Sequence, residues 1–201
     1  MLAVSTSPII ARYLENVPAV AISFWRMAFG ALILWIISFF RKQLPLIAIN
    51  RNKTLLGGFL LGIHFALFFG SLKLTTIANA TFLGTLAPIF TFFIEKYFFK
   101  RKHNPTMVLG LSVAILGAFI IVANQFDFSS DYTLGNLLAV SCSLFLGMAF
   151  IISENVRKSA TNISYSRTLF SSAAITLLGI SLLTATPITG FSSYEFGGLF
   201  L

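Results

Sequence analysis

The sequence contains very little charge for its length. Lys, Arg, Asp and Glu together make up 10% of the 201 residues, whereas a typical soluble domain carries about 25%. Cys142 is the one cysteine, so no disulfide can form within the chain and a disulfide-stapled fold is excluded. With 57% hydrophobic residues and 23 phenylalanines, the composition predicts an all-α polytopic membrane protein in contact with the lipid bilayer.

Motifs for catalysis, nucleotide hydrolysis and metal binding are also missing. The chain has no Walker A sequence, no G-x-S-x-G, no H-E-x-x-H and no cysteine–histidine cluster. We therefore expect no enzyme, no metal site, no cofactor and no ATPase. A membrane enzyme acting on lipids is disfavoured, because it would need a polar catalytic cluster at an interface. Any transport would be driven by a gradient or run downhill.

Long apolar segments dominate what is present, and a membrane-spanning helix needs about 20 such residues. The first segment is too short and lacks the basic start of a signal peptide, and the last stops at the chain end. We interpret these two as parts of helices. The expected segments are 1–13, 18–40, 54–72, 75–99, 105–123, 134–153, 163–186 and 195–201.

The basic residues alternate between loops. Every second loop is basic, and the other loops hold only Arg12 and Lys73. The first basic loop contains Arg41, Lys42, Arg51 and Lys53, the second contains Lys96, Lys100, Arg101 and Lys102, and the third contains Arg157 and Lys158. This bias predicts that the basic loops are cytoplasmic in the cell membrane, which is the inner membrane if the source is bacterial. The net charge of +8 is then a topology signal. Nucleic acid is not an expected partner, since the charges lie in short separated loops.

An internal repeat is present. The pattern S-aromatic-x-R-x-x-F occurs at 23–29 and again at 164–170, and Gly57-Gly58 corresponds to Gly197-Gly198 at nearly the same offset. Five helices per repeat is an odd number, so the second copy enters the membrane upside down, as in many secondary transporters. The predicted fold is an inverted repeat of five transmembrane helices. Residues 1–124 form the first repeat, with its first helix truncated, and residues 132–201 form an incomplete second one.

Residues 72–93 have the sequence L-K-L-T-T-I-A-N-A-T-F-L-G-T-L-A-P-I-F-T-F-F, followed by a basic loop and by Gly110 and Gly117. This stretch, with Pro18 through Arg26, resembles the EamA-like family of the drug/metabolite transporter superfamily. The resemblance implies a secondary, non-ATP transporter of small polar metabolites or drugs that works by alternating access. It does not identify the substrate. One departure is that the family usually has a Glu near the position of Arg101.

Two alternatives remain open. The chain could be a truncated, non-functional fragment of such a transporter, because three of the ten expected helices are absent or shortened. The sequence also does not decide whether the chain forms a homodimer, so the expected partners are a small-molecule substrate, the bilayer and, as an option, a second copy.

Arg26 is the first candidate for the substrate cavity. It lies about eight residues into its helix, roughly 12 Å along it, where an arginine should face protein or a wet cavity. It would attract anionic substrate groups or gate the outer mouth; alternatively, it extends to the outer headgroups or bonds a backbone carbonyl. Its repeat mate Arg167 lies near a helix start, and we expect it to extend to the cytoplasmic headgroups.

A second group of candidates lies on the segment 75–99. Thr81, Thr85, Pro88 and Phe92 are spaced by four, three and four residues, which places them on one helical face. Pro88 removes a backbone donor and frees a carbonyl near Gly84. This face would present polar groups to substrate; alternatively, it is a structural kink whose threonines bond to their own helix.

His64 and Ser7 complete the candidates. His64 points away from the small-residue stripe of Gly58, Gly62, Ala66 and Gly70, hence towards lipid or a cavity. It would line a cavity or couple protons; alternatively, it is a hydrogen-bonded packing residue. Ser7 belongs to a short polar patch that would face the cavity. A similar stripe, Gly110, Ala114 and Gly117, is expected only to pack against another helix.

Overall fold

The computed structural model describes residues 8–9, 13–14, 16–127, 129–192, 195 and 197. The expected first and last segments, 1–13 and 195–201, therefore lie almost entirely outside the described residues. The regular structure of the described part is helical: α2 (Ala19–Phe40), α3 (Ala48–Leu74), α4 (Ile77–Gly84), α5 (Ala87–Tyr97), α6 (Pro105–Val122), the short 3₁₀ turns η1 (Ala123–Gln125) and η2 (Ser130–Tyr132), α7 (Thr133–Arg157) and α8 (Asn162–Leu183).

The prediction of a polytopic all-α membrane protein is confirmed. Among the described residues, five stretches are long and apolar enough to cross a bilayer: Ala19–Phe40, Ala48–Leu74, Ile77–Tyr97, Ser130–Arg157 and Asn162–Leu183. Two of them extend beyond the predicted segments, because α3 begins at Ala48 rather than 54 and α7 continues to Arg157 rather than 153. These extensions are mostly polar, so hydropathy alone could not detect them.

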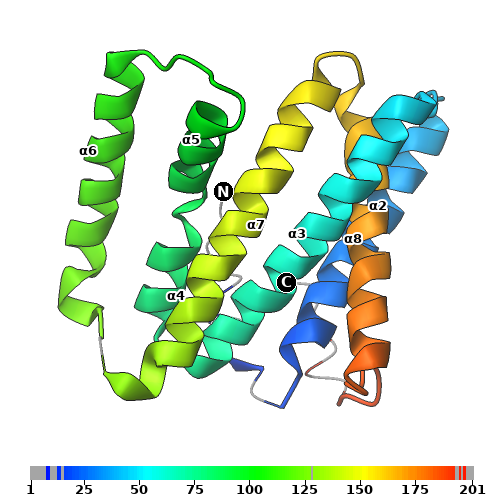
Figure 1. Ribbon diagram of the computed structural model, residues 1–201. Coiled ribbons are helices and arrows are strands. Elements are labelled where there is room, and N and C mark those ends of the chain that lie inside the picture. The colour runs from blue at the N-terminus through cyan, green and yellow to red at the C-terminus, as the bar shows by residue number, and fades with distance from the viewer. Residues whose placement is uncertain are drawn as a thin grey trace.

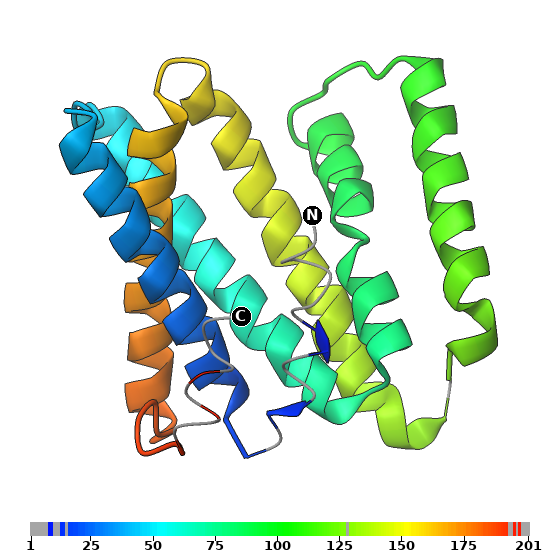
Figure 2. The same cartoon turned by 180° about the vertical axis from the view of Figure 1, so that it is seen from behind.

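The helices α3 and α7 form the centre of the bundle. α3 packs along both α7 and α8, and α2 packs against α8. α4 and α5 pack against the other side of α7, and α6 stands at the outer edge (Figures 1 and 2). The helices α2 and α8, which carry the two copies of the predicted repeat pattern, lie side by side and run in opposite directions.

Small residues set how closely α3 approaches α8. A Cβ atom added at Gly58 would lie 2.4 Å from the Cβ of Ser172, and one at Gly62 would lie 2.9 Å from the Cβ of Thr176. These contacts agree with the predicted packing stripe on α3. The stripe on α6 differs, because a Cβ at Gly110 or Gly117 would meet no atom of the described chain within 4 Å.

Arg167 does not extend to the membrane surface, so that expectation was wrong. Its side chain is buried between α8 and the end of α2, where it donates to the hydroxyl of Ser38 and to the carbonyl of Leu44, the latter at 3.2 Å. Its guanidinium carbon lies 4.5 Å from the ring centroid of Trp35. Two acceptors and an aromatic face are thus available at this helix contact, and they substitute for lipid headgroups.

These two helices, the predicted repeat mates, also end in the same backbone turn. Lys42 and Ala185 follow α2 and α8 with φ angles of 47° and 49°. The next amide donates back across the turn in both cases, Gln43 to Ser38 at 3.0 Å and Thr186 to Ser181 at 2.9 Å. This is the Schellman arrangement, which satisfies carbonyls left open at a helix end.

A candidate substrate cavity between the helices

A cavity of about 640 Å³ lies among α2, α3, α4, α7 and α8. Four of the predicted residues line it together: Arg26 from α2, His64 from α3, and Thr81 and Thr85 from α4 and its end. The sequence separates these four residues by up to 59 positions, so their meeting is a result of the fold. A cavity of this size falls within the range of small-molecule sites.

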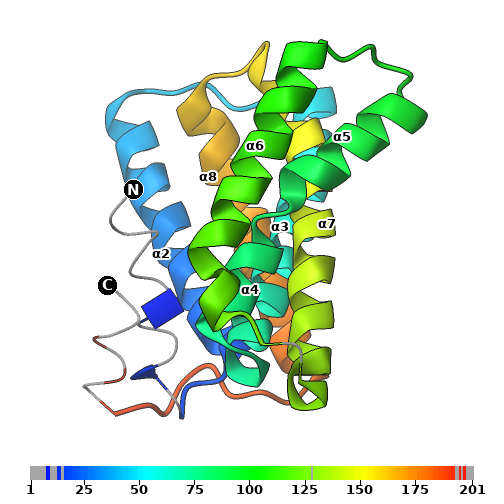
Figure 3. The same ribbon diagram turned by 90° about the vertical axis from the view of Figure 1, so that its left-hand side faces the viewer.

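The helix break predicted at Pro88 forms part of the cavity wall. α4 ends at Gly84 and α5 begins at Ala87, and Figure 3 shows α5 leaning away from the line of α4. Pro88 has no N–H to donate to the carbonyl of Gly84, and the amide of Ile89 donates to Leu86 at 2.9 Å. Gly84 and Thr85 both line the cavity, so the interrupted turn is placed at its surface.

The two threonine hydroxyls bond to their own helix. Thr81 donates to the carbonyl of Ile77 at 2.6 Å, and Thr85 donates to that of Phe82 at 2.7 Å. Such back-bonding was the structural alternative for these residues. Because each hydroxyl proton is used in this way, the oxygens can offer only their remaining lone pairs to a molecule in the cavity.

His64 is held by a bond to the facing helix. Its side chain is buried, and Nδ1 lies 2.9 Å from the carbonyl oxygen of Cys142 on α7. A carbonyl oxygen only accepts, so Nδ1 carries the proton and Nε2 is the acceptor of the neutral ring. The ring of Phe68 stacks on the imidazole at 6.1 Å between centroids, which fixes its orientation.

Arg26 supplies the charge of the cavity. It is half-buried and lies about two turns into α2, and none of the described residues lining the cavity is acidic. The start of α2 is fixed beside it, because the indole of Trp25 donates to the carbonyl of Ile188 at 2.7 Å. The cavity therefore combines one cationic group with an otherwise mostly apolar wall.

The remaining candidates do not join this cavity. Pro88 causes the break but is not among the residues that line the cavity. Phe92 lies further along α5, where the centroid of its ring is 4.7 Å from that of the His103 ring. The predicted face does not continue past the break, since α5 changes direction there. Ser7 lies outside the described residues.

Sequence reasoning missed the aromatic part of the wall. The missed residues are Phe65, Phe68 and Phe69 of α3 and Phe170 of α8. Phe68 lies one helical turn after His64, so its spacing could have indicated a shared face. Phe170 could not be found in this way, because its position depends on how α8 packs against α2 and α3.

Comparison with known proteins gives a consistent result. A model of the EamA-like transporter family matches residues 1–123. The chain is 24% identical over 174 residues to the uncharacterized transporter YyaM of Bacillus subtilis, covering 82% of this chain and 56% of that protein. It is 30% identical over 193 residues to a WAT1-related protein of Arabidopsis thaliana, covering 81% of this chain and 52% of that protein.

The chain thus spans about half the length of these curated relatives. A solved crystal structure shares the fold, with a TM-score of 0.70 at 16% identity, and the match covers 98% of this chain and 74% of that one.

Proposed function

The chain belongs to the EamA-like transporter family, a group of multi-pass membrane transporters, and from this premise we propose that it moves a small molecule across the cell membrane by alternating access. The observation that carries the proposal is the cavity enclosed by α2, α3, α4, α7 and α8. These helices come from both predicted repeats, 1–124 and 132–201, so relative motion of the repeats would expose the cavity to each side in turn.

The substrate class follows from the wall of the cavity. Arg26 is the cationic residue of the described wall, and four phenylalanines are among its apolar residues. Such a site favours a small amphipathic molecule that has an apolar or aromatic body and one anionic group. Nε2 of His64 would accept a hydrogen bond from a donor on the same molecule. We propose that a gradient drives the movement and that the chain catalyses no reaction.

An ion-pair network suggests how one side is closed. Nη1 of Arg101 lies 2.5 Å from Oε1 of Glu95 on α5 and 2.8 Å from Oε2 of Glu154 on α7. Its hydrogen bond to Glu154 and the nearby carboxylates raise the pKa of Arg101, so it stays charged at physiological pH. α5 and α7 belong to different predicted repeats. We propose that this network closes the cytoplasmic end and opens when substrate is exchanged.

Uptake into proteoliposomes tests the proposal. The probes are radiolabelled carboxylates with phenyl, indole or alkyl bodies, each paired with its uncharged amide. We expect uptake of at least one carboxylate in preference to its amide, with a large loss in Arg26→Gln. The matched control is Arg51→Gln, which removes a positive charge from an exposed site on α3 and should leave uptake unchanged. Equal uptake of carboxylates and amides, unaffected by Arg26→Gln, would contradict the assigned substrate class.

A rival proposal rests on the coverage of the relatives. The chain spans about half their length, so the 201-residue polypeptide could insert in the membrane without forming a complete pathway. Folded, monodisperse protein that takes up none of the probes would favour this rival. Uptake by the same preparation would exclude it.

A further inference from the structure

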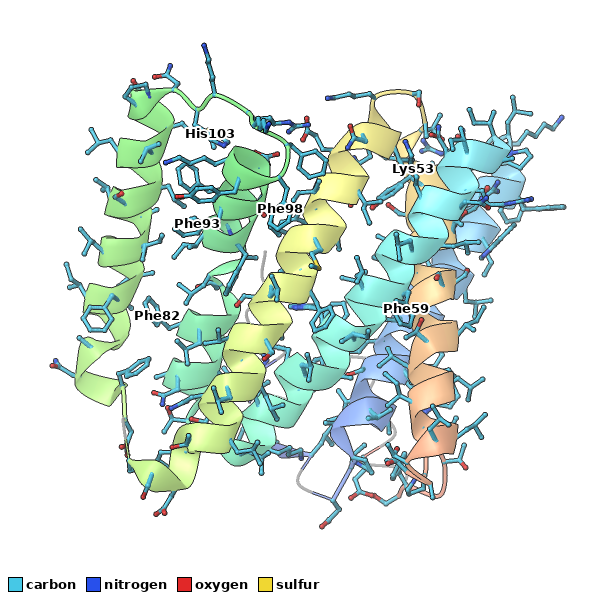
Figure 4. The ribbon with its side chains drawn as sticks, in the orientation of Figure 1. Lys53, Phe59, Phe82, Phe93, Phe98 and His103 are labelled. Atoms are coloured by element: carbon cyan, nitrogen blue, oxygen red, sulfur yellow. The ribbon has the colours of Figure 1, made fainter. Side chains whose placement is uncertain are left out.

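A second, smaller cavity lies at the end of α5, away from the first one. Its volume is about 410 Å³, and it is lined by Phe92, Lys96, Arg101, Lys102, His103 and Val108. Four of these six side chains are basic or can be protonated. Figure 4 shows His103 on the loop between α5 and α6, at one end of the helix bundle.

The positive charge of this cavity is only partly balanced by the described carboxylates, which pair with Arg101 and leave Lys96 and Lys102 without an ion pair. Arg101 uses Nη1 for both of its carboxylate partners, and its other guanidinium nitrogens have no acceptor in the described chain. Lys96 and Lys102 form no ion pair with any acidic residue in the ranges that the structure describes. The ammonium of Lys96 lies 5.6 Å from the ring centroids of both Phe92 and Tyr97, which orients it without neutralising it.

His103 adds a group with unused hydrogen-bonding capacity. Its side chain is 9% exposed, and its Nε2 lies 3.9 Å from Oε2 of Glu95. This nitrogen is buried and has no hydrogen-bond partner within the described residues. Buried polar atoms are nearly always hydrogen-bonded. The wall of this cavity therefore lacks a hydrogen-bond partner for Nε2 of His103.

The protein surface on both sides of the cavity, formed by α5 and α6, is apolar where it faces away from the helix bundle. Phe93 and Tyr97 of α5, and Phe98 directly after it, have exposed fractions of 47%, 63% and 82%. α6, on the other flank, has no buried side chain among those described. Where these surfaces face the bilayer, acyl chains would cover them. A ligand placed here would have its polar group in the cavity and its apolar part along the flanks.

We propose that this cavity binds the anionic phosphate headgroup of a membrane phospholipid. Lys96, Lys102 and the free nitrogens of Arg101 would donate to its phosphate oxygens, and the acyl chains would lie against the exposed aromatic residues of α5. Basic pockets between helices on the cytoplasmic side are suited to such headgroups. The headgroup would belong to the cytoplasmic leaflet, because the basic loops are proposed to be cytoplasmic. Free inorganic phosphate offers the same charged group, but it would leave the apolar flanks uncovered.

Lipid-dependent thermal stability tests this proposal without measuring transport, so its failure would not be confused with failure of the transport proposal. The purified protein is titrated in detergent with dihexanoyl phosphatidylglycerol, dihexanoyl phosphatidylcholine or inorganic phosphate, and Tm is recorded. The test variant is Lys96→Gln/Lys102→Gln. The control is Arg51→Gln/Lys53→Gln, which removes the same charge from exposed residues at the same end of the bundle, where Figure 4 places Lys53.

We expect phosphatidylglycerol to raise the Tm of the wild type and of the control, and phosphatidylcholine to have little effect. The apparent affinity of the test variant should fall by about thirtyfold, since each of the two lysines near a charged membrane surface contributes about 1 kcal/mol and 1.4 kcal/mol corresponds to a factor of ten. Equal loss in both double variants would show a general charge effect and overturn the proposal. An equal rise with inorganic phosphate would assign a phosphate site instead of a lipid site. If the double variant does not fold, the exposed single change Lys102→Gln, compared with Lys53→Gln, decides between the same outcomes.

Discussion

Nδ1 of His64 donates a hydrogen bond to the backbone carbonyl of Cys142, 2.9 Å away, and this bond links α3 to α7 across the two predicted repeats. It also determines the chemistry that the ring offers to the cavity, because Nε2 is left as the acceptor. One side chain thus has a structural atom and an atom available to substrate, and the two can be changed separately.

Replacement of His64 by two amides of different length separates these roles. An Asn amide nitrogen lies near the position of Nδ1, whereas a Gln amide lies near that of Nε2. We expect His64→Asn to retain the bond to Cys142 and wild-type stability but to lose substrate affinity. His64→Gln should lose the Cys142 bond, at a cost of about 1 kcal/mol in unfolding free energy. Thermal unfolding in detergent and uptake of the substrate identified for the wild type measure the two effects. Identical behaviour of the two variants would contradict this division of roles.

The close contact of α3 with α8 gives a prediction about packing. Gly58→Ala would place a Cβ 2.4 Å from the Cβ of Ser172, so α8 must shift, and we expect a loss of about 1–3 kcal/mol in stability. Gly110→Ala is the control, because its Cβ would meet no described atom within 4 Å. Thermal unfolding of both variants in the same detergent is the measurement. A control that is as unstable as Gly58→Ala would show that α6 packs against a partner that the described chain does not contain.

The buried guanidinium of Arg167 gives a third prediction. Arg167→Lys retains the charge but cannot bond Ser38 and Leu44 together while stacking on Trp35. We expect a loss of about 1.5–3 kcal/mol, the usual contribution of hydrogen bonds to a charged group. Arg157→Lys, at an exposed position near the same end of the bundle, should have little effect. Wild-type stability of Arg167→Lys would mean that the charge alone suffices at this contact.

The features that the sequence predicted well are those set by neighbouring residues. Apolar runs located the helices, Pro88 located the break after Gly84, and the spacing of Gly58 and Gly62 indicated a contact face. Local patterns failed where a distant residue decides the outcome. Arg167 is buried because Ser38 and Trp35 of α2 lie beside it.

The candidate site also contains residues that local patterns predicted and residues that only the fold brings together. Arg26, His64, Thr81 and Thr85 were proposed from depth and spacing, and they line one cavity. Phe92 was placed with them by helical periodicity, which does not hold beyond a change in helix direction. Phe170 was not proposed at all, since only the packing of α8 brings it to the cavity.

The most direct test of the central claim is whether the cavity at Thr85 is open to water and protected by substrate. Replacing Cys142, the one cysteine, by Ser allows Thr85→Cys to be labelled alone with a charged, membrane-impermeant thiol reagent in proteoliposomes. Ile175→Cys is the control, because its side chain is 68% exposed on α8 and should face lipid. We predict rapid labelling at position 85, slowed by transported carboxylates, and none at 175. Failure to label position 85, or labelling that no transported substrate slows, would contradict the assignment of this cavity as the substrate site.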